Sequence, residues 1–391
     1  MKKYFEYDRL IGENNFCNFS KEKKTLHNHI DAGDCVKIYG PRNFGKTSLV
    51  KNILAPKWES ENRDNRIILY ADFYSVESLE NISIELTKGF NKAISAKKNL
   101  FDKGMNWVKS LKNIRPVWQP STTGDGIGDF SIRTEHNNEI VDFEILFENI
   151  NNLSCNKKNK KKGLEFLIIL DEFQEIAKIK RAEAKLRNAL QNLASNIPVI
   201  ILGSKQHLLS QVFDRPKAPF YSWGYTIELH PIDYEQYNNY LNERFTQINQ
   251  SIDLETSTYL QNKLNRIPEA INRFCDFIAR DSLITNISKE IVDLKIQEFI
   301  DKSRSLYENN YTQFNKNPRK VLLALAKARV VSAVTGQKFL KEVPSVSKTG
   351  VSDIVKTLLD DSVISRDISS DGEFLYRISD PFLREFLIRY K

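Results

Sequence analysis

A glycine-rich loop carrying a lysine and two hydroxyl residues lies close to the N-terminus of the chain. Residues 40–48 fit the pattern GxxxxGK followed by Ser or Thr, and they come after a short apolar segment at 36–39. Glycines in these places allow a tight turn whose backbone N–H groups can approach an anion. The lysine can neutralise β- and γ-phosphates, and the next hydroxyl can bind Mg²⁺. We therefore predict a nucleotide-phosphate site formed by Gly40, Pro41, Arg42, Asn43, Phe44, Gly45, Lys46, Thr47 and Ser48.

Two adjacent carboxylates, Asp171 and Glu172, follow the strongly apolar segment 164–170. A buried strand rarely ends in two carboxylates without a cation or water to offset their desolvation. We expect Asp171, together with Thr47, to hold Mg²⁺, usually through water. We expect Glu172 to orient and deprotonate the attacking water, with Lys46 stabilising the transition state.

Ser204 follows the next apolar segment, 197–203. A hydroxyl at this point could reach the γ-phosphate or the attacking water. It could also cap a helix over residues 205–211, and the two roles are compatible.

Alternation of strands and helices predicts the fold around these residues. Strands are expected at 36–39, 66–73, 164–170 and 197–204, and helices at 20–31, up to Leu54 before Pro56, over most of 76–112, at 140–153 and at 173–194. Residues 114–138 are expected to be rich in turns, with one short strand at 130–133. This order predicts an α/β fold with a central parallel sheet, whose ligands bind at the carboxyl ends of the strands.

The C-terminal part has a different pattern. Residues 232–300 are helical and polar, and three short helices (318–329, 335–342, 349–359) precede strands at 363–367 and 373–378. That succession is typical of a winged helix. We expect a P-loop ATPase core at 1–225, a helical lid at 226–310 and a winged-helix domain at 311–391.

The winged helix is a candidate for binding double-stranded DNA. Ser352 and Lys356 lie on the helix that would enter a major groove, and Lys348, Arg366 and Arg377 could approach phosphates. Five aspartates in the same module would repel DNA: Asp353, Asp360, Asp361, Asp367 and Asp371. A packing or protein-interaction role for this module therefore stays open.

Composition limits the class of protein. The chain has 391 residues, 41% hydrophobic and 28% charged, with a formal charge of +8, which permits nucleic-acid binding without requiring it. No segment approaches the ~20 apolar residues of a membrane span. The charged N-terminus does not resemble a signal peptide, so we expect a cytoplasmic protein with no membrane partner.

Several other features are expected to carry no chemistry. The scattered cysteines Cys17, Cys35, Cys155 and Cys275 suggest free thiols. The segment 26–29, which contains two histidines, is expected to have a surface or packing role. The lysine run at 157–162 and the glycines at 124, 126 and 128 are expected to lie in loops.

With these motifs in place, the chain resembles the archaeal-type ATPase family, a branch of the STAND group of AAA+-related P-loop NTPases. The resemblance rests on segments 39–49, 169–174 (Ile-Leu-Asp-Glu-Phe-Gln) and 201–204, and continues at 229–232 and 376–382. It implies ATP and Mg²⁺ as ligands, slow switch-like hydrolysis, and a lid and winged helix that move relative to the core. Where the family usually has Gly-Gly-x-Pro, this chain has Asn265-Arg266-Ile267-Pro268, and where an arginine commonly follows Pro-Leu-Tyr-Gly, residues 219–224 read Pro-Phe-Tyr-Ser-Trp-Gly.

Three functions are compatible with these residues: an ATP-hydrolysing switch, a DNA-binding regulator that keeps ATP as a structural ligand, and a scaffold that contacts protein or a second copy of itself. Hydrolysis would also use an arginine near the γ-phosphate. The sequence does not choose among Arg181, Arg187, Arg215, Arg266 and Arg273.

Overall fold

A computed structural model describes residues 3–97, 114–119, 129–134, 141–154, 163–204, 206–369 and 371–391. Cys155, the lysine run at 157–162 and the glycines at 124–128 lie outside these residues. The chain divides into two compact units, one made of residues 19–40 and 46–229 and the other of residues 1–18, 41–45 and 230–391. We call them the sheet unit and the lid unit.

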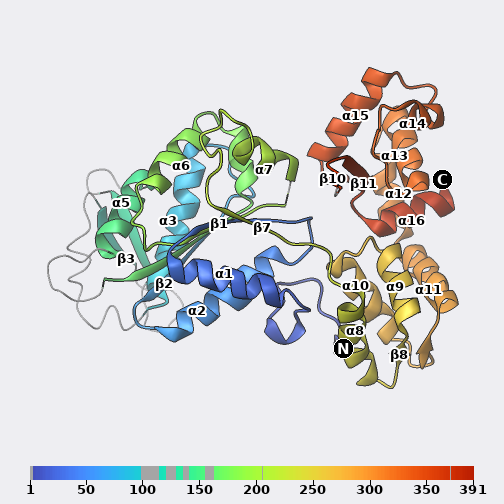
Figure 1. Cartoon of the computed structure of the whole chain (residues 1–391), viewed down its shortest axis with the longest axis horizontal. Coiled ribbons are helices and arrows are strands. Elements are labelled where there is room, and N and C mark those ends of the chain that lie inside the picture. Colours follow the sequence, from blue (N-terminus) through green and yellow to red (C-terminus); the bar gives the residue numbers. More distant parts are fainter. Residues whose placement is uncertain are drawn as a thin grey trace. The chain divides into compact units, whose positions relative to one another are not determined.

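The sheet unit is built on five parallel strands in the order β2-β5-β6-β1-β7 (Figure 1). The strands are β1 (Cys35–Tyr39), β2 (Arg66–Asp72), β5 (Glu165–Asp171), β6 (Val199–Leu202) and β7 (Tyr225–Glu228). The predicted parallel α/β fold is therefore confirmed. Residues 167–170 on β5 are all fully buried, because both faces of this central strand are covered.

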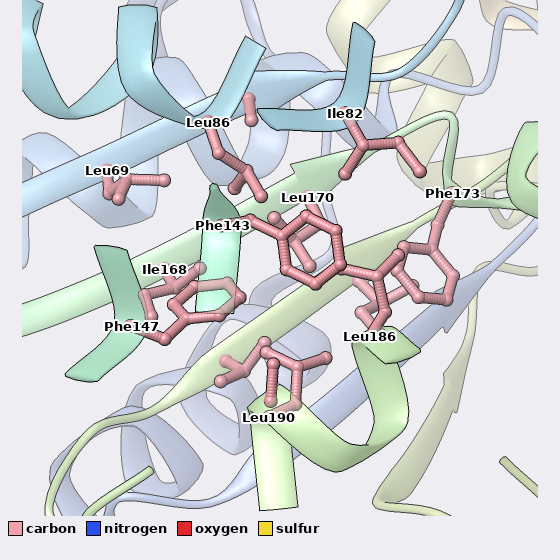
Figure 2. Packing of buried hydrophobic residues seen from close by; sticks show 14 of the residues in the cluster. Leu69, Ile82, Leu86, Phe143, Phe147, Ile168, Leu170, Phe173, Leu186 and Leu190 are labelled. Carbon is pink, nitrogen blue, oxygen red and sulfur yellow. The ribbon is translucent and has the colours of Figure 1, made fainter. Parts of the chain in front are cut away.

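Helices cover both faces of this sheet. Figure 1 shows α1 (Ser20–Ala32) and α2 (Ala55–Glu61) on one side, and α3 (Leu79–Ser95) and α6 (Ala182–Gln191) on the other. Together with α5 (Phe143–Ser154) and α7 (Gln206–Phe213), the helices of the second side enclose a large apolar core. Figure 2 shows Leu86, Phe143 and Phe147 packed against Ile168 and Leu170 of β5. This packing makes the sheet a rigid support for residues at its carboxyl edge.

The helix after the phosphate loop does not end at Pro56 as expected. A π-helical stretch, Ser48–Leu54, runs directly into α2, and the N–H of Ala55 bonds to the carbonyl of Val50. The wider π turn tolerates a proline that cannot donate an N–H and would crowd the preceding turn of an α-helix. Pro56 therefore lies in the first turn of α2, and the helical run continues through it.

Three other elements differ from expectation. Residues 173–194 form a 3₁₀ helix (Phe173–Lys178) and then α6, separated by Arg181 at φ 67°, so they are not one helix. Within segment 114–138, where one strand was expected, residues 114–119 form an additional strand, β3. It pairs antiparallel with β4 (Asp129–Thr134), which contains the expected strand. Pro116 obscures β3 in the sequence, although a two-stranded ribbon tolerates proline because each strand is an edge. Strand β7 has only four residues and was not predicted.

The lid unit contains α8 (Tyr234–Thr246), α9 (Leu254–Lys263), α10 (Pro268–Ala279), α11 (Lys289–Lys302) and α12 (Arg304–Thr312). Two short strands in the loops between these helices, β8 (Ser251–Ile252) and β9 (Asn286–Ile287), pair with each other in parallel. The N-terminal segment packs on these helices: the Phe5 ring lies 4.9 Å from that of Phe245, and Asp276 accepts the N–H of Tyr4 at 3.0 Å.

The winged helix follows closely the predicted pattern. Helices α13 (Lys316–Ala328), α14 (Gln337–Glu342) and α15 (Lys348–Asp360) precede the antiparallel strands β10 (Ile364–Ile368) and β11 (Phe374–Ile378), and α16 (Pro381–Tyr390) ends the chain. Gly372, at φ 80°, lies in the turn of the wing. Among the described residues, no helix is long and apolar enough to cross a bilayer.

Candidate phosphate and magnesium site

The phosphate loop follows β1 at the carboxyl edge of the sheet. A Cβ atom at Gly40 would lie 3.1 Å from the Cβ of Leu229, so the close passage of these two segments favours glycine. Within the loop, Asn43 and Gly45 have φ values of 65° and 84°. Left-handed residues of this kind occur in the backbone concavities that bind anions. The loop conformation is therefore suited to phosphate.

Lys46 and Thr47 occupy the start of the helical run that follows the loop. The Lys46 ammonium donates a 2.7 Å hydrogen bond to the carbonyl of Gly40, and the side chain is only 6% exposed. The Thr47 hydroxyl donates a 2.7 Å bond to Asp171 Oδ2, although the two residues are 124 positions apart. The structure thus brings together the two predicted magnesium ligands.

Asp171 ends β5 and is nearly buried. Burial raises the pKa of its carboxyl group, and the bond from Thr47 opposes that shift. The Tyr70 hydroxyl donates a second bond to the same Oδ2, at 2.9 Å. A buried carboxylate next to a threonine hydroxyl presents the oxygen ligands that Mg²⁺ prefers, so these residues fit the ion. Mg²⁺ also needs negative charge, which Asp171 would supply in its ionised form.

Glu172 lies beside Asp171 in the left-handed region, at φ 50°. Its backbone N–H donates to Asp171 Oδ1 at 2.9 Å, and its carboxylate Oε2 accepts a 2.8 Å bond from the Ser204 hydroxyl. The next residue, Phe173, is fully buried between the rings of Phe73 and Phe213, at 6.0 and 5.8 Å. This anchor holds the tight turn that brings Glu172 to Ser204.

Two residues of this cluster were not among the predicted site residues. Tyr70 projects from β2, where Asp72 pairs in register with Asp171. Gln174, from the Asp-Glu-Phe-Gln motif, donates its side-chain N–H to Glu172 Oε2. The signal for Gln174 was its place in that motif, whereas Tyr70 could be found only from strand register.

The candidate arginines are distributed over both units. Arg181, Arg187 and Arg215 belong to the sheet unit, and Arg215 faces Glu183 at 3.5 Å. In the lid unit, Arg273 lies 3.7 Å from Glu269, and Arg266 donates to the carbonyl of Ile232. The predicted role of an arginine at the γ-phosphate stays a prediction for each of them.

The arginines of the wing have partners within the module. Arg377 forms a 2.8 Å ion pair with Asp367, and Arg366 lies 4.3 Å from the centre of the Phe374 ring. Lys348, Ser352 and Lys356 on α15 are exposed. Of the basic residues predicted to approach DNA, those exposed to solvent are therefore Lys348 and Lys356 on α15.

The two histidines of α1 lie beside acidic side chains. His29 Nδ1 is 2.7 Å from Asp34 Oδ2, and His27 Nε2 is 3.4 Å from Glu61 Oε1. Glu61 also bonds to Arg66 at 2.5 Å. A metal ion bound to His27 would need the Glu61 carboxylate, but Arg66 already bonds to that carboxylate. This arrangement is in keeping with the surface or packing role expected for segment 26–29. Cys17, Cys35 and Cys275 are free thiols, as expected.

Comparison with known proteins identifies two families of domain. Residues 16–262 match the model of an ATPase domain predominantly from Archaea, and residues 305–389 match a probable winged helix domain. No curated protein matches the chain.

Solved structures that are similar along almost the whole chain include the following two. The Walker-type ATPase PABY2304 of Pyrococcus abyssi has 15% identity and a TM-score of 0.60, with 98% of this chain and 99% of that one covered. The ORC2 protein of Aeropyrum pernix, solved as ADPNP and ADP complexes, has 14% identity and a TM-score of 0.53, with 98% and 97% covered. At such identities the likeness establishes the fold: a P-loop ATPase core followed by a winged helix.

Proposed function

Because this chain belongs to the family of ATPase domains found predominantly in Archaea, we propose that it binds ATP with Mg²⁺ and hydrolyses it as a molecular switch. The observation that carries the proposal is the 2.7 Å contact between Thr47 and Asp171, with Glu172 and Ser204 paired beside it. Residues 40–48 would bind the phosphates, and Thr47 and Asp171 would hold the ion. The bound ion would neutralise charge on the β- and γ-phosphates.

The side chains have distinct roles in this proposal. Lys46 would leave the Gly40 carbonyl for the phosphates and stabilise charge that develops on the γ-phosphate. Glu172 would accept a proton from the attacking water, and Ser204 would orient that water or the γ-phosphate. We propose residues 1–225 as the ATPase core, 226–310 as the lid and 311–391 as the winged helix that responds to the nucleotide.

Turnover of ATP by purified protein, with and without Mg²⁺, tests this function. We expect Lys46→Ala to weaken ATP binding, and Glu172→Gln to retain binding while turnover falls at least ~100-fold, as for loss of a general base. Lys57→Ala, on the exposed surface of α2, is a suitable control for the loss of one lysine. A Glu172→Gln protein that hydrolyses ATP at the wild-type rate would contradict the assigned role.

A second function, binding of duplex DNA, is favoured by the exposed Lys348, Ser352 and Lys356 on α15. The corresponding alternatives are a DNA-binding regulator that does not hydrolyse ATP, and a scaffold whose winged helix contacts only protein. ATP turnover measured with and without duplex DNA separates the ATP-hydrolysing switch from the DNA-binding regulator. Duplex affinity measured at several salt concentrations identifies the scaffold, because a protein that does not bind DNA shows no salt-dependent affinity.

A further inference from the structure

Gln174 is a fully buried glutamine two residues after Glu172, inside the 3₁₀ helix that begins at Phe173. Its side-chain nitrogen donates to Glu172 Oε2, the same oxygen that accepts the Ser204 hydroxyl at 2.8 Å. The nitrogen also lies 3.5 Å from Glu175 Oε1. Two neutral donors, from different elements, therefore converge on one oxygen of the Glu172 carboxylate.

The backbone around Gln174 leaves room for this side chain and little else. A Cβ atom at Gly203 would lie 2.6 Å from Gln174 Oε1 and 2.5 Å from a methyl of Leu209. Gly203 immediately precedes Ser204. The glycine that leaves room for the Gln174 amide is therefore next to the residue that provides the second donor to Glu172. The Asp-Glu-Phe-Gln motif therefore contacts the Gly-Ser pair that follows β6.

The amide is costly for stability alone. Gln174 Oε1 is buried and has no hydrogen-bond partner. A buried acceptor without a partner costs roughly 1–3 kcal/mol, and an apolar side chain of similar volume would avoid that cost. Such an apolar side chain could fill the space, but it could not donate to Glu172.

We propose that Gln174 is a positioning residue that, together with Ser204, holds the Glu172 carboxylate where it can take a proton from the attacking water. The inference rests on the proposed hydrolysis of ATP and adds a residue to it. In this proposal Gln174 acts through Glu172 and has no direct contact with the nucleotide or the ion. A displacement of about 1 Å in a catalytic group can cost on the order of 100-fold in rate, so the effect belongs in kcat.

The test compares Gln174→Met with Gln261→Met. Methionine keeps a similar volume but removes the donor. Gln261 is a matched control because it is also fully buried in a helix, has an unpartnered Oε1 and donates to Ser257 at 3.1 Å, far along the chain from the site. We expect Gln174→Met to lower kcat by about 10- to 100-fold while Kd for ATP changes less than twofold, and Gln261→Met to leave kcat unchanged.

A double variant distinguishes positioning from a structural effect. Added to Glu172→Gln, the Gln174→Met change should lower turnover no further, because its effect passes through Glu172. If Gln174→Met does not fold, Gln174→Asn keeps the amide but shortens its reach and should show the same loss of kcat. Wild-type kcat in a folded Gln174 variant, or a loss of ATP binding equal to the loss of turnover, would overturn this inference and leave the ATPase proposal intact. Absence of turnover in the wild type would overturn both.

Discussion

At the scale of single residues, the site depends on the carboxylate of Asp171, whose ionised form is disfavoured by burial. Asp171 is 4% exposed, and burial raises its pKa. A carboxyl group with a raised pKa binds its proton more tightly in the folded chain than in the unfolded one. The free energy of unfolding therefore decreases as pH rises from the ordinary value of 3.8 through the pKa of the folded state, and the cost is complete above that point.

Asp171→Asn should therefore stabilise the nucleotide-free protein at neutral pH. Asparagine has the same shape and carries no buried charge. Its oxygen can still accept the bonds from Thr47 and Tyr70, but its amide nitrogen cannot accept the N–H of Glu172, so the net gain is smaller than removal of the charge alone would give. A gain of about 1 kcal/mol would raise the Tm of a domain of this size by roughly 2–4 °C. Thermal unfolding at pH 7 without nucleotide measures the gain. A lower Tm, or a Mg²⁺-dependent turnover equal to the wild type, would show that the charge is not held there for the ion.

The backbone of the lid carries strain that its sequence does not reveal. Asn265 and Arg266 have φ values of 54° and 55°, at the two positions where the family pattern has Gly-Gly. The chain thus adopts a left-handed backbone at both positions without glycine. The Arg266 side chain offsets part of the strain, because it donates to the carbonyl of Ile232 and lies 4.0 Å from the centre of the Tyr234 ring.

We expect Arg266→Gly to be more stable than Arg266→Ala. Both lose the side-chain contacts, but alanine keeps a left-handed conformation that costs roughly 1–2 kcal/mol, and glycine adopts it freely. This order is the reverse of the one found in ordinary helical positions. Denaturant unfolding of the two full-length variants measures the difference. Equal midpoints would mean that residue 266 leaves the left-handed region when its side chain is removed.

We expect duplex binding to depend on the exposed face of α15. Lys356 and Asp353 are both exposed and lie one turn apart on this helix. Lys356→Ala should weaken binding and reduce the salt slope by about 1, as for loss of one phosphate contact. Asp353→Asn should strengthen binding by removing repulsion. Lys327→Ala, at an exposed position of α13, serves as a control for loss of one positive charge elsewhere in the module. Affinities unchanged by both α15 variants would favour the protein-interaction role.

The elements differ in how far the sequence predicts them. Three helices and two strands of the winged helix were predicted to within two residues, because glycine, serine and proline mark their turns and each element has a clear period, whereas α16 was not predicted. β7 was missed because it has four residues, of which only Ile227 is buried, so it shows no apolar run. Thr47 and Asp171 were predicted to meet because the motif requires it. The contacts of Tyr70 and Gln174 depend on strand register and side-chain packing, which periodicity does not encode.

At the scale of the whole molecule, nucleotide binding should be visible as stability. A ligand at 100 times its Kd stabilises the folded state by about 2.7 kcal/mol, which corresponds to roughly 5–10 °C in Tm for a domain of 150–250 residues. We expect that rise with Mg²⁺ and ATP in the wild type and in Glu172→Gln, and a smaller one in Lys46→Ala.

The time course of this stabilisation separates a switch from a structural ligand. With a limited amount of ATP, the wild-type Tm should decline towards the value measured with ADP as hydrolysis proceeds, whereas Glu172→Gln should keep the ATP value. Both proteins would keep it if ATP were only a structural ligand. Gln174→Met should decline more slowly than the wild type in proportion to its lower kcat, because Gln174 contacts Glu172 and is proposed to act only through it. The same measurement on the whole chain therefore tests the general base, the residue that positions it and the switch they would drive.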